Sequence, residues 1–178
     1  MSKLFVDDIV EKTSNHGVQI PGHVVQIVQG EHSTQLLSSS STYAATGVTA
    51  SITPSSTSSK ILVCVQINGV YKDGNNSTGV GIRVKRDSTE IKVLASRAGG
   101  DNGTGGSAVQ SIGTVGGDIL DSPSTTSAIT YKIQVFQTQN SSDSTKTVCI
   151  NRAGRDADDS AGHDGNAASS ITVMEVSG

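Results

Sequence analysis

The chain contains no tryptophan, and only 3% of its residues are aromatic. Because a buried aromatic side chain removes a large apolar area from water, this scarcity leaves a thin hydrophobic core for a chain of 178 residues. A thin core in a β-rich protein is often supplemented by contacts between copies, which bury a second set of side chains. We therefore expect a homo-oligomer.

Charge and hydropathy argue against two classes of partner. The net charge is −3 and the pI is about 5.7, so the chain lacks the basic surface that a general nucleic-acid binder needs. No stretch approaches the roughly 20 apolar residues of a membrane helix, so we expect no membrane insertion. The opening MSKLFVDDIVEK lacks the pattern of a secretory signal, which predicts synthesis and folding in a cytoplasm.

Cysteine is also scarce, with one residue at Cys64 and one at Cys149. Each lies in a strand-like segment, and in a reducing compartment two buried free thiols are expected. A single disulfide between neighbouring strands is the alternative, which the spacing leaves open. Without a CxxC motif or a nearby histidine, the pair predicts no zinc site, and we expect no cofactor.

Serine, threonine, glycine and asparagine are abundant, and they separate short β-type segments. In the clearest segment, 60–70, the two-residue period places Ile61, Val63, Val65 and Ile67 on one face. Leu62 and Cys64 make the other face apolar at one end, which suits packing against a neighbouring subunit. We expect further strands at 23–29, 34–38, 48–52, 107–114, 118–121, 129–138, 145–151 and 170–176, and a hairpin at 79–94 with Val80, Ile82, Val84, Ile91 and Val93 on its apolar face.

About eight to ten short strands with frequent turn signals and no helical pattern predict an all-β fold. Among such folds, an antiparallel jelly-roll-like β-sandwich is favoured, formed by residues 23–178. Residues 1–22 differ, with scattered apolar side chains and a stop at Pro21 and Gly22. They are too short to fold alone, so we expect an extended N-terminal arm or stalk that pairs with another chain.

Two loops carry the candidate binding residues. Asp156, Asp158, Asp159 and Asp164 supply the oxygen ligands that Ca²⁺ prefers, but their spacing lacks the ordered pattern of a calcium loop. A solvated acidic loop is therefore the main interpretation, and no metal site is predicted. The glycine-rich span 98–106 lacks the Gly-Lys-Ser/Thr element of a phosphate site and predicts a surface loop.

Exposed loops carry recognition in many proteins, and here they offer the candidates Tyr71, Asp73, Asn75, Asp101 and Asn102. Tyr131, in contrast, falls on the apolar face of its strand and is expected in the core. The four histidines join no Ser-His-Asp pattern in a recognisable context, so the chain is not expected to be an enzyme.

Five segments occur in a familiar order: GHVVQIVQG (22–30), ITPSSTSSKILV (52–63), DSPSTTSAITYKIQV (121–135), INRAGRD (150–156) and SSITVMEV (169–176). Together they resemble a domain that recurs in tail-fibre and other virion surface proteins of bacteriophages, especially marine and cyanobacterial phages. The resemblance covers nearly the whole chain. It implies a virion structural protein, often trimeric, with a compact β head on a short stalk and no catalytic residues.

The combined prediction is a non-enzymatic phage virion protein: a short tail fibre, a knob or a capsid decoration on the particle surface. We expect a homotrimer whose arm, residues 1–22, contacts other capsid or tail proteins. The alternative is a carbohydrate- or cell-surface-binding module that recognises a host glycan. A small hydrolase is the third hypothesis, although no set of residues in the sequence assembles a site for it.

Overall fold

A computed structural model describes residues 22–72, 78–99, 111–138, 147–152 and 167–178. Within these ranges the chain forms strands and no helix. The strands are β1 (Val24–His32), β2 (Leu36–Ser38), β3 (Ala44–Ile52), β4 (Lys60–Lys72), β5 (Gly79–Arg86), β6 (Thr89–Ala98), β7 (Ser111–Asp121), β8 (Ile129–Thr138), β9 (Val148–Ile150) and β10 (Ser169–Val176).

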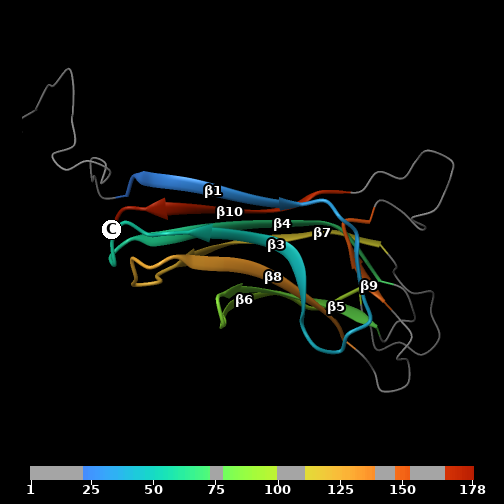
Figure 1. The fold of residues 1–178 in the computed structure, drawn as a ribbon. Coiled ribbons are helices and arrows are strands. Elements are labelled where there is room, and N and C mark those ends of the chain that lie inside the picture. The colour runs from blue at the N-terminus through green and yellow to red at the C-terminus, as the bar shows by residue number, and fades with distance from the viewer. Residues whose placement is uncertain (1–21, 73–77, 100–110, 139–146, 153–166) are drawn as a thin grey trace, which may run out of the picture.

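The strands form two antiparallel sheets that face each other (Figure 1). Sheet A has the order β1-β10-β4-β7. The short strand β9 pairs with the last two residues of β4, Tyr71 and Lys72, and β2 pairs with β9. Sheet B has the order β3-β8-β5-β6. In each sheet a late strand lies between two early ones, which is the strand arrangement of a jelly roll. The predicted fold class is confirmed.

The core lies between the sheets and follows the alternation of the strands. Ile61, Val63, Val65 and Ile67 of β4 are all buried, as their spacing predicted. On β8, alternate residues including Tyr131 point into the same core. Because successive side chains of a strand point to opposite faces, a small set of valine and isoleucine residues fills the interior without tryptophan.

The hairpin of β5 and β6 turns at Asp87, which has a φ of 50°. Val80, Ile82 and Val84 are fully buried, as predicted. The prediction for Val93 is wrong, because its side chain is 43% exposed. Irregularities in the pairing of β5 with β6 shift the register, and Leu94 packs against the core instead.

Other strand boundaries also differ from the predicted ones. The expected segments 107–114 and 118–121 belong to one strand, β7, over the residues described. The cysteines form no disulfide, but only Cys149 is buried, whereas Cys64 lies on the outer face of sheet A and is partly exposed. Residues 1–21 of the predicted arm lie outside the described residues. At the arm's end, Gly22 N donates to Ser177 O at 2.8 Å, which joins the start of β1 to the end of β10.

Candidate interaction surface

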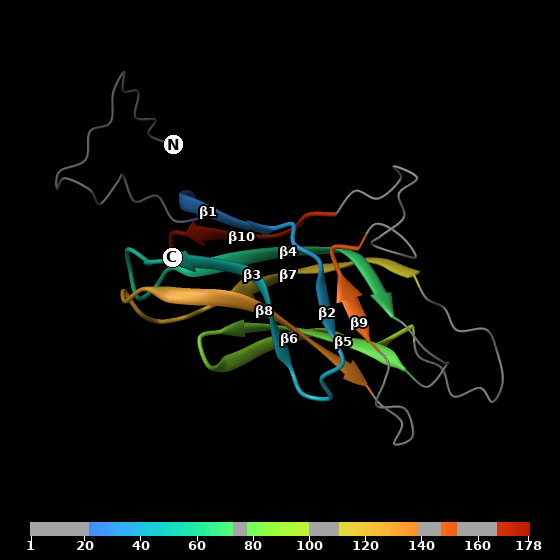
Figure 2. The same cartoon turned by 45° about the vertical axis from the view of Figure 1, so that its right-hand side comes forward.

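At one end of the sandwich β4, β6 and β8 end and β5, β7 and β9 begin (Figure 2). In the sequence, the predicted binding residues lie in or beside the connections that follow β4, β6 and β9. Most of them fall in connections outside the described ranges. This is so for the recognition candidates Asp73, Asn75, Asp101 and Asn102 and for the calcium candidates Asp156, Asp158, Asp159 and Asp164. Their roles stay predictions, and the described part of this end consists of the residues that anchor the connections.

Tyr71 was expected at the surface, and the structure corrects this expectation. Its side chain is 9% exposed, and the guanidinium of Arg152 lies 4.7 Å from the centre of its ring. Irregularities in the pairing of β4 with β7, between Ile67 and Val70 and again between Val70 and Tyr71, interrupt the two-residue alternation. An unbroken two-residue period would already place Tyr71 on the buried face of Ile61 and Ile67, and its ring stacks under a cation.

Lys72 ends β4 and is fully buried, although lysine is almost never found there without partners. Its ammonium group donates to the backbone carbonyl of Thr78 at 2.6 Å, which ties the end of β4 to the start of β5. A buried charge is tolerated only where hydrogen bonds satisfy it. Sequence reasoning missed Lys72, because a lysine beside a glycine- and asparagine-rich turn looks solvent-exposed.

Asn151 is the central anchor of this end. It is fully buried and has a positive φ of 59°, a conformation that asparagine tolerates better than most residues. Its side-chain amide donates to the carbonyls of His32 at 2.9 Å and Thr34 at 3.0 Å, and its side-chain oxygen accepts from the Ser169 hydroxyl. One side chain from the INRAGRD motif thus connects the ends of β1, β9 and β10.

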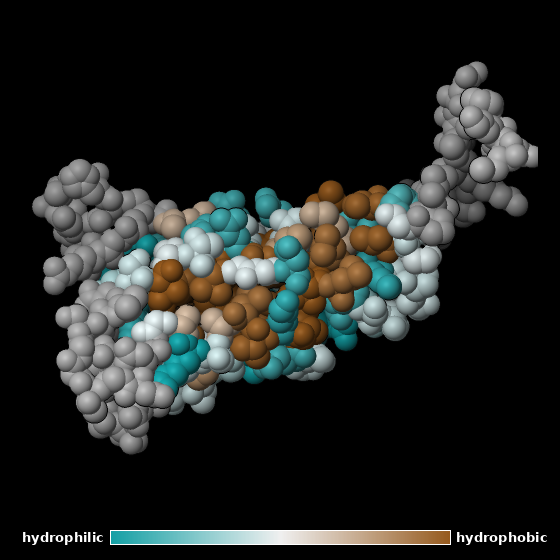
Figure 3. Space-filling model, turned by 180° about the vertical axis from the view of Figure 1, so that it is seen from behind, coloured by the Kyte–Doolittle hydropathy of each residue, from teal (hydrophilic) through white to brown (hydrophobic). Residues whose placement is uncertain are grey.

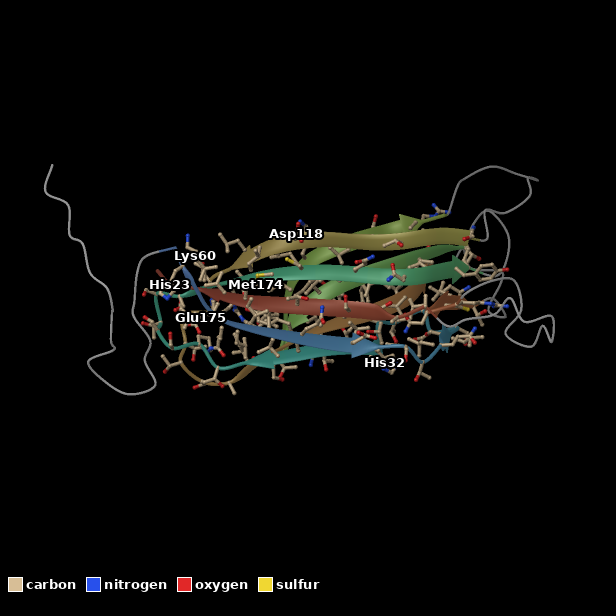
Figure 4. All side chains as sticks on the ribbon, turned by 90° about the horizontal axis from the view of Figure 1, so that it is seen from above. His23, His32, Lys60, Asp118, Met174 and Glu175 are labelled. Atoms are coloured by element: carbon tan, nitrogen blue, oxygen red, sulfur yellow. The ribbon has the colours of Figure 1, made fainter. Side chains whose placement is uncertain are left out.

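A second polar cluster lies at the opposite end and surrounds Glu175 (Figure 4). The buried carboxylate accepts hydrogen bonds from the Gln26 side chain at 2.6 Å, the Ser55 backbone at 2.7 Å and the Ser55 hydroxyl at 2.6 Å. Burial acts to raise the pKa of Glu175, but these hydrogen bonds outweigh it and hold the pKa below its ordinary value. The cluster ties β1 and β10 to the Ser/Thr-rich connection before β4.

A third cluster joins the two sheets through Asp121. Its carboxylate accepts from the Arg86 guanidinium at 2.6 Å and from the Tyr131 hydroxyl at 2.7 Å. Burial, together with the hydrogen bond to this carboxylate, raises the pKa of Tyr131 well above its ordinary value, so the phenol stays protonated. The tyrosine therefore acts as a hydrogen-bond donor between β8 of sheet B and β7 of sheet A.

The described residues contain no group of three or more histidine, cysteine, aspartate or glutamate side chains placed to hold a metal ion. Within the same ranges, no helix has the length and apolar character needed to cross a membrane. The three polar clusters hold strand ends and connections together. We therefore turn to the outer faces of the two sheets as candidate interaction surfaces.

The outer face of sheet B is occupied by side chains that pair with one another. The Arg83 guanidinium donates to Glu90 at 2.9 Å and to Gln134 at 2.9 Å, and it lies 3.7 Å from the centre of the Tyr43 ring. That ring packs 4.3 Å from the ring of Phe136. The polar and aromatic side chains of this group are therefore paired within one chain.

The outer face of sheet A differs. Four apolar side chains, one from each of β1, β10, β4 and β7, lie in register across it, and we call them the apolar row: Ile27, Met174, Leu62 and Leu120. Ile27 is 60% exposed and Leu120 57%, whereas Met174 and Leu62 are half-buried. Sequence reasoning identified only the apolar character of Leu62 and Cys64 in this region.

A further apolar region lies where the edge strands β6 and β7 approach each other. Seen from behind, hydrophobic side chains gather along the middle of this side (Figure 3). The Lys92 ammonium crosses it and donates to the Asp118 carbonyl at 3.2 Å. The partly buried residues that the two strands contribute here pack against the core: Ile91, Leu94, Ala95, Ala98, Ile112, Val115 and Ile119.

No protein-family model matches the chain, and no curated protein matches it in sequence. Among solved structures, the chain is similar to the infectious bursal disease virus VP2 subviral particle, with a TM-score of 0.50 and 10% sequence identity. The match covers 86% of this chain and 33% of that one, so this chain spans about a third of that protein. At this identity the likeness establishes a shared fold.

Proposed function

We propose that the chain is a non-enzymatic structural protein of a virus particle. The observation that carries the proposal is the jelly-roll strand order, matched over 86% of the chain by a protein of a viral subviral particle. Fold alone does not determine function.

Within this class, we propose a bacteriophage protein on the particle surface: a short tail fibre, a knob or a capsid decoration. Support comes from the five ordered sequence segments, whose described residues include most of β1, the beginning of β4, much of β8, the last residue of β9 and all of β10. We further propose a homotrimer, with residues 1–22 as an arm that contacts other virion proteins. The arm would leave the sandwich at Gly22, beside the end of β10.

Recognition of a host-surface glycan is the second candidate. It is favoured by Lys72, whose hydrogen bond to Thr78 ties together the two strand ends that flank the connection carrying Asp73 and Asn75. The candidates Asp101 and Asn102 belong to the connection between β6 and β7. Loops held on a rigid β framework are a common basis for recognition. Saturable binding of the purified chain to host cells, lost when 100–106 is replaced by a short Gly-Ser linker, would support this candidate.

Immunogold labelling of purified particles of the virus that encodes the chain tests the main proposal. Antibody raised against the folded chain should label intact particles at a fixed location, and peptides of the chain should be found by mass spectrometry after the particles are washed. Absence of the chain from purified particles would contradict the proposal, whereas label on the head or on the tail would distinguish a decoration from a fibre.

A further inference from the structure

We infer that the outer face of sheet A is a contact surface between two copies of this chain, packed face to face about a two-fold axis that runs along the apolar row. The inference rests on the proposed function, in which copies of the chain assemble with one another. It assigns the surface through which two copies would pack.

The apolar row is continuous across four strands. Ile27 pairs with Met174, Met174 with Leu62, and Leu62 with Leu120. Because neighbouring strands lie about 4.8 Å apart, the four side chains form a line about 14 Å long. At one end of the sheet, Val24 pairs with Val176 and widens the apolar region, and the Val24 side chain is 47% exposed.

The fold itself does not require these apolar side chains. On the same strands, Val63 and Val173 point inward and are fully buried, and Val28 and Ile119 pack against the core. The row faces the other way, so polar side chains would serve this face equally well in an isolated sandwich. Contiguous apolar patches on a protein surface commonly mark interaction sites, and removing one from water contributes about 25 cal/mol per Å².

Charges on either side of the row favour a second copy as the occupant. Lys60 precedes Leu62 by two residues on β4, and Asp118 lies opposite Cys64, two residues beyond Leu62. Figure 4 shows Lys60, Met174 and Asp118 in this order along one face of the sheet. Among the described residues, Lys60 takes part in no ion pair.

A half-turn about the row exchanges its two sides. Leu62 of one copy then meets Leu62 of the other, and Lys60 of each copy lies over Cys64 of its partner. Asp118 is one strand away from that point, about 5 Å to the side, which a lysine side chain spans. The apolar row and the charges beside it are therefore self-complementary, as an isologous contact requires, whereas Val24 and Val176 face Gln29 and Thr172 of the other copy.

The size of the face predicts a modest affinity. Four strands and eight residues measure about 19 by 26 Å, or roughly 500 Å² of projected area for each copy, which is at the small end of specific interfaces. A two-fold contact closes at two units. It would therefore pair single chains or, if the proposed homotrimer forms, pair trimers.

The test is the native mass of the full chain, measured by light scattering over a concentration series. Leu120→Asp, in the row, should halve the mass seen for the wild type at high concentration, because the change places two carboxylates in one apolar contact. Val93→Asp is the matched control: it changes an exposed apolar residue of β6, in sheet B, and should leave the mass unchanged. Circular dichroism and thermal melting establish that both variants fold.

A charge exchange separates a second copy from any other partner. Lys60→Asp alone and Asp118→Lys alone should each weaken the pairing about 10-fold or less, as single rim charges do, and the double variant should restore it. A wild type that never exceeds the mass of the Leu120→Asp variant would overturn the inference, and so would equal effects of Leu120→Asp and Val93→Asp. The mass of the dissociated unit, one chain or three, independently tests the proposed trimer.

Discussion

The outer faces of the two sheets contrast sharply, although both sheets contribute alternate side chains to one core. On sheet B, Arg83 joins Glu90, Gln134 and the Tyr43 ring, so these side chains are paired within one chain. On sheet A, the apolar row runs across four strands and leaves Ile27 and Leu120 more than half exposed. This difference in exposed apolar side chains is the reason why we place the proposed contact on sheet A rather than on sheet B.

The largest predicted effect contrasts the inner and outer faces of β10. Ile171→Ala removes a fully buried side chain and should lower the free energy of unfolding by about 2–5 kcal/mol. Met174→Ala, three residues along on the outer face, should cost much less in the dissociated chain but should weaken pairing. Urea denaturation at low protein concentration measures the first effect, and light scattering measures the second. Equal stability losses would contradict the assigned orientation of β10.

Asn151→Ala tests the end of the sandwich where the short strands β2 and β9 pair. There the Asn151 side chain connects the ends of β1, β9 and β10. The change leaves the carbonyls of His32 and Thr34 without their donor and places alanine at a positive φ, so we expect a loss of about 2–3 kcal/mol. Thr172→Ala on the outer face is the control, with an expected change within about 0.5 kcal/mol. Thermal denaturation provides the measurement.

At the opposite end of the sandwich, the buried carboxylate of Glu175 predicts that the stability of the fold depends on pH. Its pKa is lowered in the folded state, so its contribution to stability is fully present above the unfolded pKa of about 4.5 and is lost as pH falls through the lower folded value. Glu175→Gln should therefore flatten the stability profile in this acidic range. A variant whose stability falls with pH as steeply as that of the wild type would show that other carboxylates control the transition.

The smallest effect is expected on sheet B. Arg83→Lys keeps the charge but removes the planar group that contacts the Tyr43 ring and Gln134, and it should cost about 0.2–1 kcal/mol, because the Glu90 ion pair is solvent-exposed. Oligomer mass should not change. A shift in mass with this variant would transfer the proposed contact to sheet B and remove the contrast between the faces.

Much of the fold was predictable because it depends on local alternation. The two-residue period of β4 and β8 identified Ile61, Tyr131 and their companions as core residues before any pairing was known. Irregular pairing defeated the same reasoning at Val93, where the register shifts. Tyr71 was expected at the surface because it stands beside a turn-like sequence, not because of the alternation. Sequence patterns carry no signal for such shifts, because they depend on the partner strand.

The candidate surface was less predictable for a similar reason. Leu62 looked unusual within its own strand, but Ile27, Met174 and Leu120 lie far apart in the sequence. Only the strand order of the jelly roll brings the four into one row. Lys72 and Asn151 were missed because both are polar residues in turn-like sequence, and their burial follows from long-range hydrogen bonds.

The most direct test of the account is a cross-link between copies. An equal mixture of ¹⁴N- and ¹⁵N-labelled chains, treated with a zero-length carbodiimide, should yield a Lys60–Asp118 peptide pair of mixed isotope composition. Within one chain the two residues are about four residues apart along β4, roughly 13 Å, which is too far for this link. Mixed pairs at this position would establish the face-to-face contact of sheet A. Their absence from a chain that still forms cross-linked oligomers through other residues would contradict it.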